Sequence, residues 1–275
     1  MAAQEKPQER VRVSGPERNE DGFLEFHVEC PWQERPTTVE VLPPDEMDAE
    51  GAYPVLWLLP VNPCTRGRWG DALVEARRLD LANRRRLICV SPSFSRTPWF
   101  ADHPTDEAVA QETYLLEAVL PLIEERFPAG KRPEDRLLVG FSKSGVGAWS
   151  LLLRHPDVFG FAASWDAPMT LPQPDRWGME EVYGTQEHYE RHFIPALLRK
   201  RVDELKDRPA RLVLLGHGTF EEPVRAVHEQ LEGLGVPHVY ANEPKRAHNW
   251  KSGWLPEAVE HLMRLREGAL EAREQ

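Results

Sequence analysis

Short apolar runs alternate with helical patterns along most of this chain, and this alternation constrains its fold more than any other feature. Amphipathic helical spacing covers 107–127, 223–234 and 255–272, and Pro121 should kink the first of these helices or mark its last turns. Strands separated by helices predict βαβ units in a mostly parallel sheet, with an antiparallel pair at the N-terminal end. The runs of strand length are 23–30, 37–42, 53–59, 87–90, 137–141, 159–165, 211–215 and 236–240.

Two segments fall outside this alternation. Residues 1–22 are polar and charged, and we interpret them as an N-terminal leader, which leaves 23–275 as one α/β domain. Residues 169–208 form a stretch that is too long for an ordinary connection between a strand and the next. Because long ordered insertions are often functional, we interpret this stretch as a partly helical cap over the working end of the sheet. The alternative is a surface excursion without a role.

The composition excludes several classes of protein. With 41% hydrophobic residues the chain has a core, and a net charge of −11 offers no basic face for nucleic acid. No apolar run approaches the roughly 18 residues that cross a bilayer, and the N-terminal stretch has no apolar signal core, so no membrane partner is expected. Cys30, Cys64 and Cys89 are an odd set without metal-ligand spacing. We therefore expect a reduced, cytoplasmic protein without a metal site.

Residues 137–148 place a serine between an apolar strand and a helix of small residues. They read Leu-Leu-Val-Gly-Phe-Ser-Lys-Ser-Gly-Val-Gly-Ala, with Ser142 at the turn. A nucleophile there needs small neighbours two positions away on each side, because strand and helix nearly touch, and Gly140 and Ser144 meet this need. The helix N-terminus favours a developing oxyanion, for which the backbone N–H of Lys143 is a candidate donor. The alternative is a glycine-rich turn that only starts a helix.

A serine nucleophile needs a base, and His248 is the first candidate. It follows the last strand in the sequence Arg-Ala-His-Asn-Trp, which is where the chain order Ser, acid, His places the base. His103 and His217 are the loop alternatives.

Together these segments resemble the putative-esterase branch of the α/β-hydrolases, which includes S-formylglutathione hydrolases, feruloyl esterases and enterochelin esterases. The matching pieces are Tyr-Pro-Val-Leu-Trp-Leu-Leu at 53–59, Pro-Trp-Phe-Ala-Asp at 98–102, Gly-Phe-Ser-Lys-Ser-Gly at 140–145 and His-Asn-Trp at 248–250. The resemblance implies an α/β-hydrolase fold with about eight strands in a mostly parallel central sheet and helices on both faces. It also implies acyl-enzyme chemistry at a serine, without a cofactor.

The sequence departs from this family at the oxyanion hole. Members usually carry His-Gly just after the third strand, whereas this chain reads Pro-Val-Asn-Pro-Cys at 60–64. Pro60 and Pro63 have no N–H to donate, so Val61 or Asn62 is the expected second donor beside Lys143.

A second departure concerns the acid. The family usually places an Asp after the strand that is 211–215 here, and Thr219 stands at that position. Asp166 is the first candidate instead, because it ends the neighbouring strand at the same edge of the sheet. Glu221 or Glu222 from a shifted loop, or an incomplete triad, remain as alternatives. The structural roles of these groups would be an N-cap for Asp166 and first-turn helix charges for the glutamates.

Four tryptophans are expected near this edge of the sheet: Trp69, Trp99, Trp165 and Trp250. They predict an aromatic-lined pocket for an aryl or acyl group, with loop anchoring as the alternative.

The sequence thus predicts a serine hydrolase that cleaves a small-molecule carboxylic ester through an acyl-enzyme, with Ser142, His248 and Asp166 as its triad. A thioesterase that uses the same residues is one alternative. The other is a catalytically degenerate member that binds a ligand or a partner, and it is motivated by Thr219 and by the prolines at 60–64.

Overall fold

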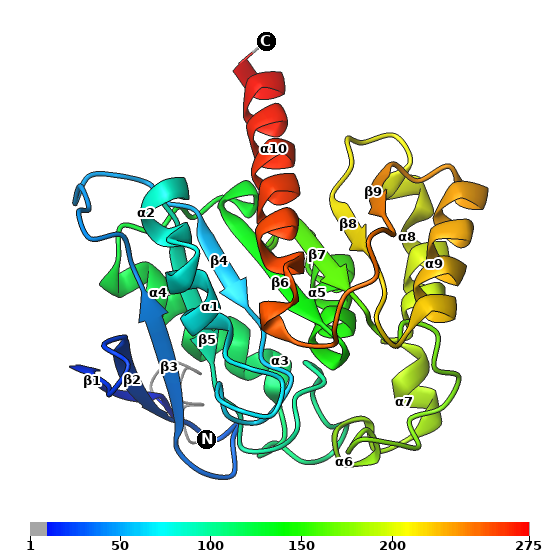
Figure 1. Ribbon diagram of the computed structural model, residues 1–275. Helices are drawn as coiled ribbons and strands as arrows, with labels where there is room; N and C mark the ends of the chain where they lie inside the picture. Colours follow the sequence, from blue (N-terminus) through cyan, green and yellow to red (C-terminus); the bar gives the residue numbers. More distant parts are fainter. Residues whose placement is uncertain (1–9, 275) are drawn as a thin grey trace, which may run out of the picture.

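The centre of the fold is a nine-stranded sheet with the order β1-β2-β3-β5-β4-β6-β7-β8-β9 (Figure 1). The computed structural model describes residues 10–274. The strands are β1 (Arg12–Arg18), β2 (Leu24–Glu29), β3 (Thr37–Leu42), β4 (Val55–Leu58), β5 (Ile88–Pro92), β6 (Arg136–Phe141), β7 (Phe161–Trp165), β8 (Leu212–Leu215) and β9 (His238–Ala241). Neighbours from β1 to β5 pair antiparallel, and those from β5 across to β9 are parallel. The mostly parallel α/β sheet is as predicted.

Helices cover both faces of this sheet. One face packs against α1 (Ala72–Arg78), α2 (Leu81–Arg85) and α10 (Trp254–Glu274), which crosses the front of the sheet in Figure 1. The other face packs against α3 (Gln111–Tyr114), η2 (Leu115–Val119), α4 (Leu120–Arg126), α5 (Lys143–Arg154), α8 (Ile194–Leu205) and α9 (Glu221–Leu234). The remaining short elements are α6 (Glu180–Tyr183), α7 (Gln186–Glu190), η3 (Pro133–Asp135) and η4 (Trp250–Ser252).

Burial on both faces explains why the central strands are continuous apolar runs. In β4, Val55 and Trp57 join the core under α3–α5, whereas Leu56 and Leu58 join the core under α1 and α10. Successive side chains point to opposite faces of a strand, so every position of such a strand must be apolar. Within residues 10–274, none of the helices combines the length and the apolar composition that a membrane crossing requires.

Strand β1 differs from the prediction, which assigned residues 1–22 to a polar leader. Residues 12–18 pair antiparallel with β2, and the register shifts between Ser14 and Glu17. Every residue of β1 except Val13 is exposed, so this edge strand has no apolar alternation from which it could be recognised. Residues 1–9 of the proposed leader lie outside the described residues.

The helix predicted over 107–127 is also divided. It begins at Gln111 and changes at η2 into a π-helical turn before continuing as α4. Pro121 is the second residue of α4, two positions after this turn ends, and it has no N–H to donate to the preceding turn. The helix has this wider turn just before the proline and then continues through Pro121 to Arg126.

The segment 169–208 is well packed against the rest of the domain. Its last helix, α8, packs on α5 and is the ordinary crossover between β7 and β8. Before it, α6 and α7 lie at the lower right in Figure 1, with Tyr183 and Tyr189 buried. The indole N–H of Trp99 donates to the carbonyl oxygen of Trp177 at 3.1 Å, which fastens the segment to the loop after β5. Its role as a cap over a functional site stays a prediction.

A buried histidine in this segment makes the stability of the fold depend on pH. His192 is 6% exposed, and its Nδ1 lies 3.0 Å from the carbonyl oxygen of His188. Burial, assisted by the positive charge of Arg154, lowers the pKa of His192 from 6.5 to about 3. Between these pH values the unfolded chain binds a proton that the folded chain does not. The contribution of neutral, buried His192 to the stability of the fold is therefore fully present above pH 6.5, and it is lost as the pH falls towards about 3.

We expect His192→Gln to remove this pH dependence, because the amide does not titrate. The free energy of unfolding of the wild type should fall by up to about 1.4 kcal/mol per pH unit more steeply than that of the variant. Urea unfolding at a series of pH values measures both slopes. His27→Gln, at an exposed position of β2, is the control and should keep the wild-type slope. Equal slopes in the wild type and His192→Gln would contradict the expectation.

Candidate active site

Ser142 occupies a sharp turn between β6 and α5. β6 ends at Phe141, α5 begins at Lys143, and the Ser142 backbone has φ 54° and ψ −131°. A positive φ is unfavourable for a residue with a Cβ, so the surrounding packing must hold it. A Cβ on Gly140 would lie 2.4 Å from the carbonyl carbon of Ser144. This close approach of strand and helix is the geometry that the small residues around Ser142 predicted.

Asp166 is joined to this turn through the backbone. It directly follows β7, the parallel neighbour of β6, and has φ 43°. The N–H of Ser142 lies 3.2 Å from the carbonyl oxygen of Asp166 and 3.3 Å from that of Trp165. The N–H of Asp166 donates in turn to the carbonyl oxygen of Gly216, just after β8, at 2.9 Å. Strand ends therefore hold Ser142 and Asp166 side by side.

The side chain of Asp166 is fully buried, and both of its oxygens have partners. Oδ1 accepts hydrogen bonds from the N–H groups of Thr219 at 2.7 Å and Phe220 at 2.6 Å. Oδ2 lies 2.6 Å from Nδ1 of His248. Burial raises the pKa of Asp166, but the hydrogen bonds from His248 and from the backbone outweigh it and hold the pKa below its ordinary value. Asp166 is therefore a carboxylate at neutral pH.

His248 reaches this carboxylate from the segment after β9. A carboxylate only accepts hydrogen bonds, so Nδ1 of His248 carries the hydrogen, and the lone pair of the neutral ring is then on Nε2. The ring packs edge-on against Trp69 at 4.9 Å and Phe141 at 5.0 Å, and it lies 5.7 Å from Phe220. Since Phe141 directly precedes Ser142, these contacts bring the histidine to the serine turn.

The contacts of the alternative bases and acids are with other groups than Asp166 or His248. His217 is buried, with Nδ1 2.7 Å from the amide oxygen of Asn242, and Nδ1 of His103 accepts from backbone N–H groups of its own loop. Glu221 and Glu222 lie in the first turn of α9, and Glu221 is 58% exposed beside His217. The structure thus brings Asp166, and neither glutamate, to His248.

The candidate oxyanion donors come from two elements at this edge. Lys143 lies in the first turn of α5, where helix geometry provides no carbonyl partner for its N–H. Val61 and Asn62 follow β4, which pairs with β6, and the N–H of Leu59 donates to the carbonyl oxygen of Val139 at 3.0 Å. All three candidate donors therefore start from strand ends next to the Ser142 turn.

The tryptophans differ from the expected pocket lining. Trp165, Trp250 and Trp99 are 0%, 2% and 1% exposed, because they pack in the core beneath the site or beside Tyr183. Large indole rings next to strand ends are buried here as anchors, which was the alternative interpretation. Trp69 alone among the four is only partly buried, where it packs against His248.

Two further aromatic residues border the site. Phe220 contacts the ring of His248, and Trp177 packs edge-on against Phe220 with ring centroids 6.0 Å apart. Trp177 is 46% exposed, and within residues 10–274 no other large hydrophobic side chain is classed as exposed. Their signal in the sequence was weak, because Phe220 follows a loop without a regular pattern and Trp177 stands in the irregular part of 169–208.

The family model described as "Putative esterase" matches residues 32–230, which is more than half of the chain. This chain belongs to that esterase family. The family predicted from the four matching segments is thereby confirmed, together with the α/β-hydrolase fold.

Two curated relatives of this esterase are Esterase MT1326 and Esterase Rv1288 of Mycobacterium tuberculosis. Each is 28% identical over 137 residues, which cover 48% of this chain and 29% of the relative. The chain thus matches less than a third of the length of these relatives.

Solved structures share the fold of the esterase at low identity. FphF, a fluorophosphonate-binding serine hydrolase of Staphylococcus aureus, has a TM-score of 0.72 at 17% identity and covers 89% of this chain and 98% of its own. A ferulic acid esterase has a TM-score of 0.69 at 17% identity, covering 93% and 99%. An S-formylglutathione hydrolase of Agrobacterium tumefaciens has a TM-score of 0.65 at 18% identity, covering 89% and 95%.

Gly218 allows the loop after β8 to lie close to Asp166, so an added methyl group at this position should disturb both the loop and the carboxylate. A Cβ at Gly218 would lie 2.4 Å from the carbonyl oxygen of Arg246 and 2.8 Å from Oδ2 of Asp166. Gly218→Ala should lower the free energy of unfolding by about 1–3 kcal/mol and weaken the hydrogen bond between His248 and Asp166. Denaturant unfolding measures the first effect, and the low-field NMR signal of the His248 Nδ1 proton measures the second.

The matched control is Gly233→Ala. Gly233 lies within α9 with no atom within 4 Å of an added Cβ, so alanine should raise stability by up to about 1 kcal/mol. In this control the NMR signal of the His248 Nδ1 proton should stay at the wild-type position. A Gly218→Ala protein with wild-type stability and an unshifted signal would show that this loop tolerates the methyl group.

Proposed function

We propose that this esterase hydrolyses a carboxylic ester of a small molecule through an acyl-enzyme intermediate at Ser142. The observation that carries the proposal is the 2.6 Å contact between His248 Nδ1 and Asp166 Oδ2 beside the positive-φ turn of Ser142. The chain order is then serine, acid, histidine, as in other α/β-hydrolases.

In the first half of the reaction, Oγ of Ser142 attacks the ester carbonyl while Nε2 of His248 takes its proton. Asp166 holds the imidazole in this orientation and stabilises its cation. The N–H of Lys143 and that of Val61 or Asn62 donate to the oxyanion of the tetrahedral intermediate. When the intermediate collapses, the His248 cation returns the proton to the leaving alcohol.

In the second half, a water molecule attacks the acyl-enzyme. His248 removes the proton of this water, and the same N–H groups stabilise the second oxyanion. Collapse then releases the carboxylic acid and restores Ser142 by return of the proton. The reaction as proposed uses no cofactor.

We further propose that the apolar part of the ester packs on the aromatic side chains around His248. Trp69 and Phe220 both contact the imidazole ring, and Trp177, from the 169–208 segment, packs against Phe220. An exposed aromatic ring beside a reactive group favours aryl or acyl groups over charged ones. In this proposal the 169–208 segment acts as the cap of the site through Trp177.

Substitution of the three residues tests the mechanism. With p-nitrophenyl esters of short acids, Ser142→Ala should lower kcat/KM by about 10⁴-fold or more, and Asp166→Asn by roughly 10⁴-fold through the wrong imidazole tautomer. Glu221→Gln and Glu222→Gln are the matched acid controls and should retain wild-type rates, since neither side chain reaches His248. A normal rate for Asp166→Asn together with a low rate for Glu221→Gln would move the acid to the glutamate.

Labelling with a fluorophosphonate tests whether the site reacts at all. A working serine, base and oxyanion hole should attach the probe to Ser142, which mass spectrometry of the labelled peptide identifies. His248→Gln should abolish labelling, whereas Thr219→Ser should not. Absence of labelling and of ester hydrolysis in the folded wild type would support a protein that only binds a ligand or partner.

A thioesterase would use the same residues. Comparing kcat/KM for an oxygen ester and a thioester of the same acid separates the two activities, and we expect the oxygen ester to be preferred. Cys30, Cys64 and Cys89 are unpaired, and we propose a reducing, cytoplasmic location for the protein.

A further inference from the structure

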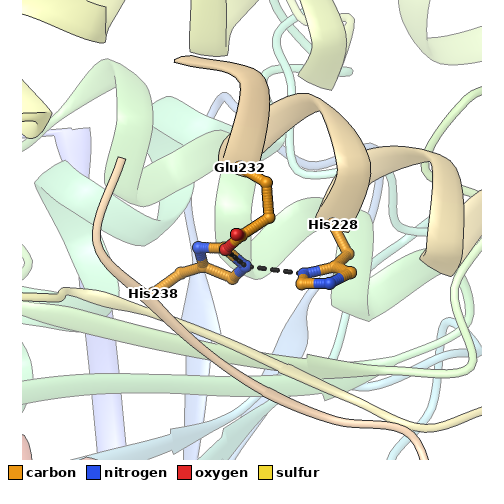
Figure 2. Close-up of side chains that lie close together, drawn as sticks. All are labelled: His228, Glu232 and His238. Atoms are coloured by element: carbon orange, nitrogen blue, oxygen red, sulfur yellow. Dashed lines mark hydrogen bonds and ion pairs between the residues drawn. The ribbon is translucent and has the colours of Figure 1, made fainter. Parts of the chain in front are cut away.

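A cluster of two histidines and a glutamate lies away from the serine turn, between α9 and β9. His228 and Glu232 are one helical turn apart on α9, and His238 begins the neighbouring strand β9. Figure 2 shows the two helix side chains pointing toward the ring of His238. One nitrogen or oxygen from each residue lies within 4.8 Å of the others, and within residues 10–274 this set alone has such metal-binding spacing.

The distances between these atoms suit a shared metal ion. Nδ1 of His228 lies 2.9 Å from Nε2 of His238, and Oε1 of Glu232 lies 3.9 Å from the same Nε2. Two imidazole nitrogens bound to one zinc ion at about 2.0–2.1 Å lie roughly 3.3 Å apart when the geometry is tetrahedral. Shifts of about half an ångström in the three side chains would therefore admit the ion.

The surroundings fix the lone pair of His238 toward this centre. Its Nδ1 lies 2.9 Å from the carbonyl oxygen of Val236, which can only accept, so Nδ1 carries the hydrogen. Nε2 of His238 is then the free acceptor, and in the metal-free protein Nδ1 of His228 donates to it. A carbonyl oxygen bonded to the outer nitrogen is the usual support of a metal-binding histidine.

The ring of His228 is also held in place. It stacks on Tyr240 with ring centroids 3.7 Å apart and an interplanar angle of 9°. This stacking restricts rotation of the imidazole about the Cβ–Cγ bond, so Nδ1 stays directed at His238. For a metal to bind, His228 must change tautomer: its Nδ1 hydrogen exchanges with solvent and Nε2 of the same ring takes up a hydrogen, so the imidazole stays neutral.

We propose that His228, Glu232 and His238 bind a divalent transition-metal ion such as Zn²⁺, which joins α9 to the edge strand β9. Two imidazoles and one carboxylate are a ligand set that zinc accepts, whereas magnesium and calcium prefer oxygen ligands. The Glu232 side chain is 66% exposed, so water completes the coordination. The bland alternative is a histidine pair that shares one hydrogen bond beside an exposed glutamate.

Zinc titration of chelator-treated, untagged full-length protein tests the proposal. Calorimetry should give one zinc ion per chain in the wild type. His228→Gln and Glu232→Gln each remove a ligand and should weaken binding by more than the roughly 10–100-fold that loss of an outer-sphere partner costs. Neither residue belongs to the proposed catalytic machinery, so ester hydrolysis by the metal-free variants should equal that of the metal-free wild type.

Thermal unfolding provides a second readout. Zinc at about a hundredfold excess over Kd should raise the Tm of the wild type by about 5 °C and leave the Tm of the double variant His228→Gln, Glu232→Gln unchanged. His27→Gln is the matched control, because His27 also stands on a strand with Nε2 3.6 Å from a glutamate, Glu25, but lacks a second histidine. This control should bind zinc like the wild type.

Two results would overturn the proposal. One is a wild type that binds no zinc and has an unchanged Tm, which would leave the histidine pair as a hydrogen bond only. The other is a double variant that binds zinc as tightly as the wild type, which would assign the ion to another group such as the exposed Cys64. Both results are independent of whether Ser142 is a nucleophile.

Discussion

The arrangement of the site depends on the hydrogen bonds that stabilise the buried carboxylate of Asp166. Water is excluded from it, so the charge must be stabilised by protein donors, and the loop after β8 supplies two N–H groups while His248 supplies a third donor. Backbone hydrogen bonds continue this connection from Ser142 to Asp166, from Asp166 to Gly216 and from Gly216 to Ala241. The ends of four neighbouring strands are thereby held in one register around a single charge.

The same hydrogen bonds support the proposal that the acid stands on a different strand from the one usual in the family. Thr219 has no carboxylate, yet its N–H donates to Asp166, so the loop after β8 holds the proposed acid instead of providing it. The carboxylate oxygen still faces Nδ1 of His248, which is the requirement that the chemistry imposes. Gly218 fits this function, because any side chain there would meet Asp166 and Arg246.

The features that were predicted correctly from the sequence are those whose signal lies within a few neighbouring residues. The apolar runs of β4 and β6, the small residues around Ser142 and the histidine after β9 each have a signal within a few residues, and the family and the fold followed from them. Strand β1 has no such signal because its side chains are polar and exposed. The burial of Trp165 and the contact of Phe220 with His248 depend on residues far apart in the chain. The search for a metal site in the sequence considered the spacing of the cysteines. It therefore did not find the cluster of His228, Glu232 and His238, whose side chains come from a helix and a strand.

The short edge strand β9 links the two sites. It has four residues, all only partly buried, and it pairs in the sheet with β8 alone, so it belongs to the elements that open most easily. His238 begins this strand, and the segment that follows it carries His248 to Asp166. The position of the proposed base therefore depends on a weakly held strand. A metal ion bound to His238 would tie the first residue of β9 to α9, at the end of the strand opposite to the segment that carries His248. It would in this way stabilise the site without touching the substrate.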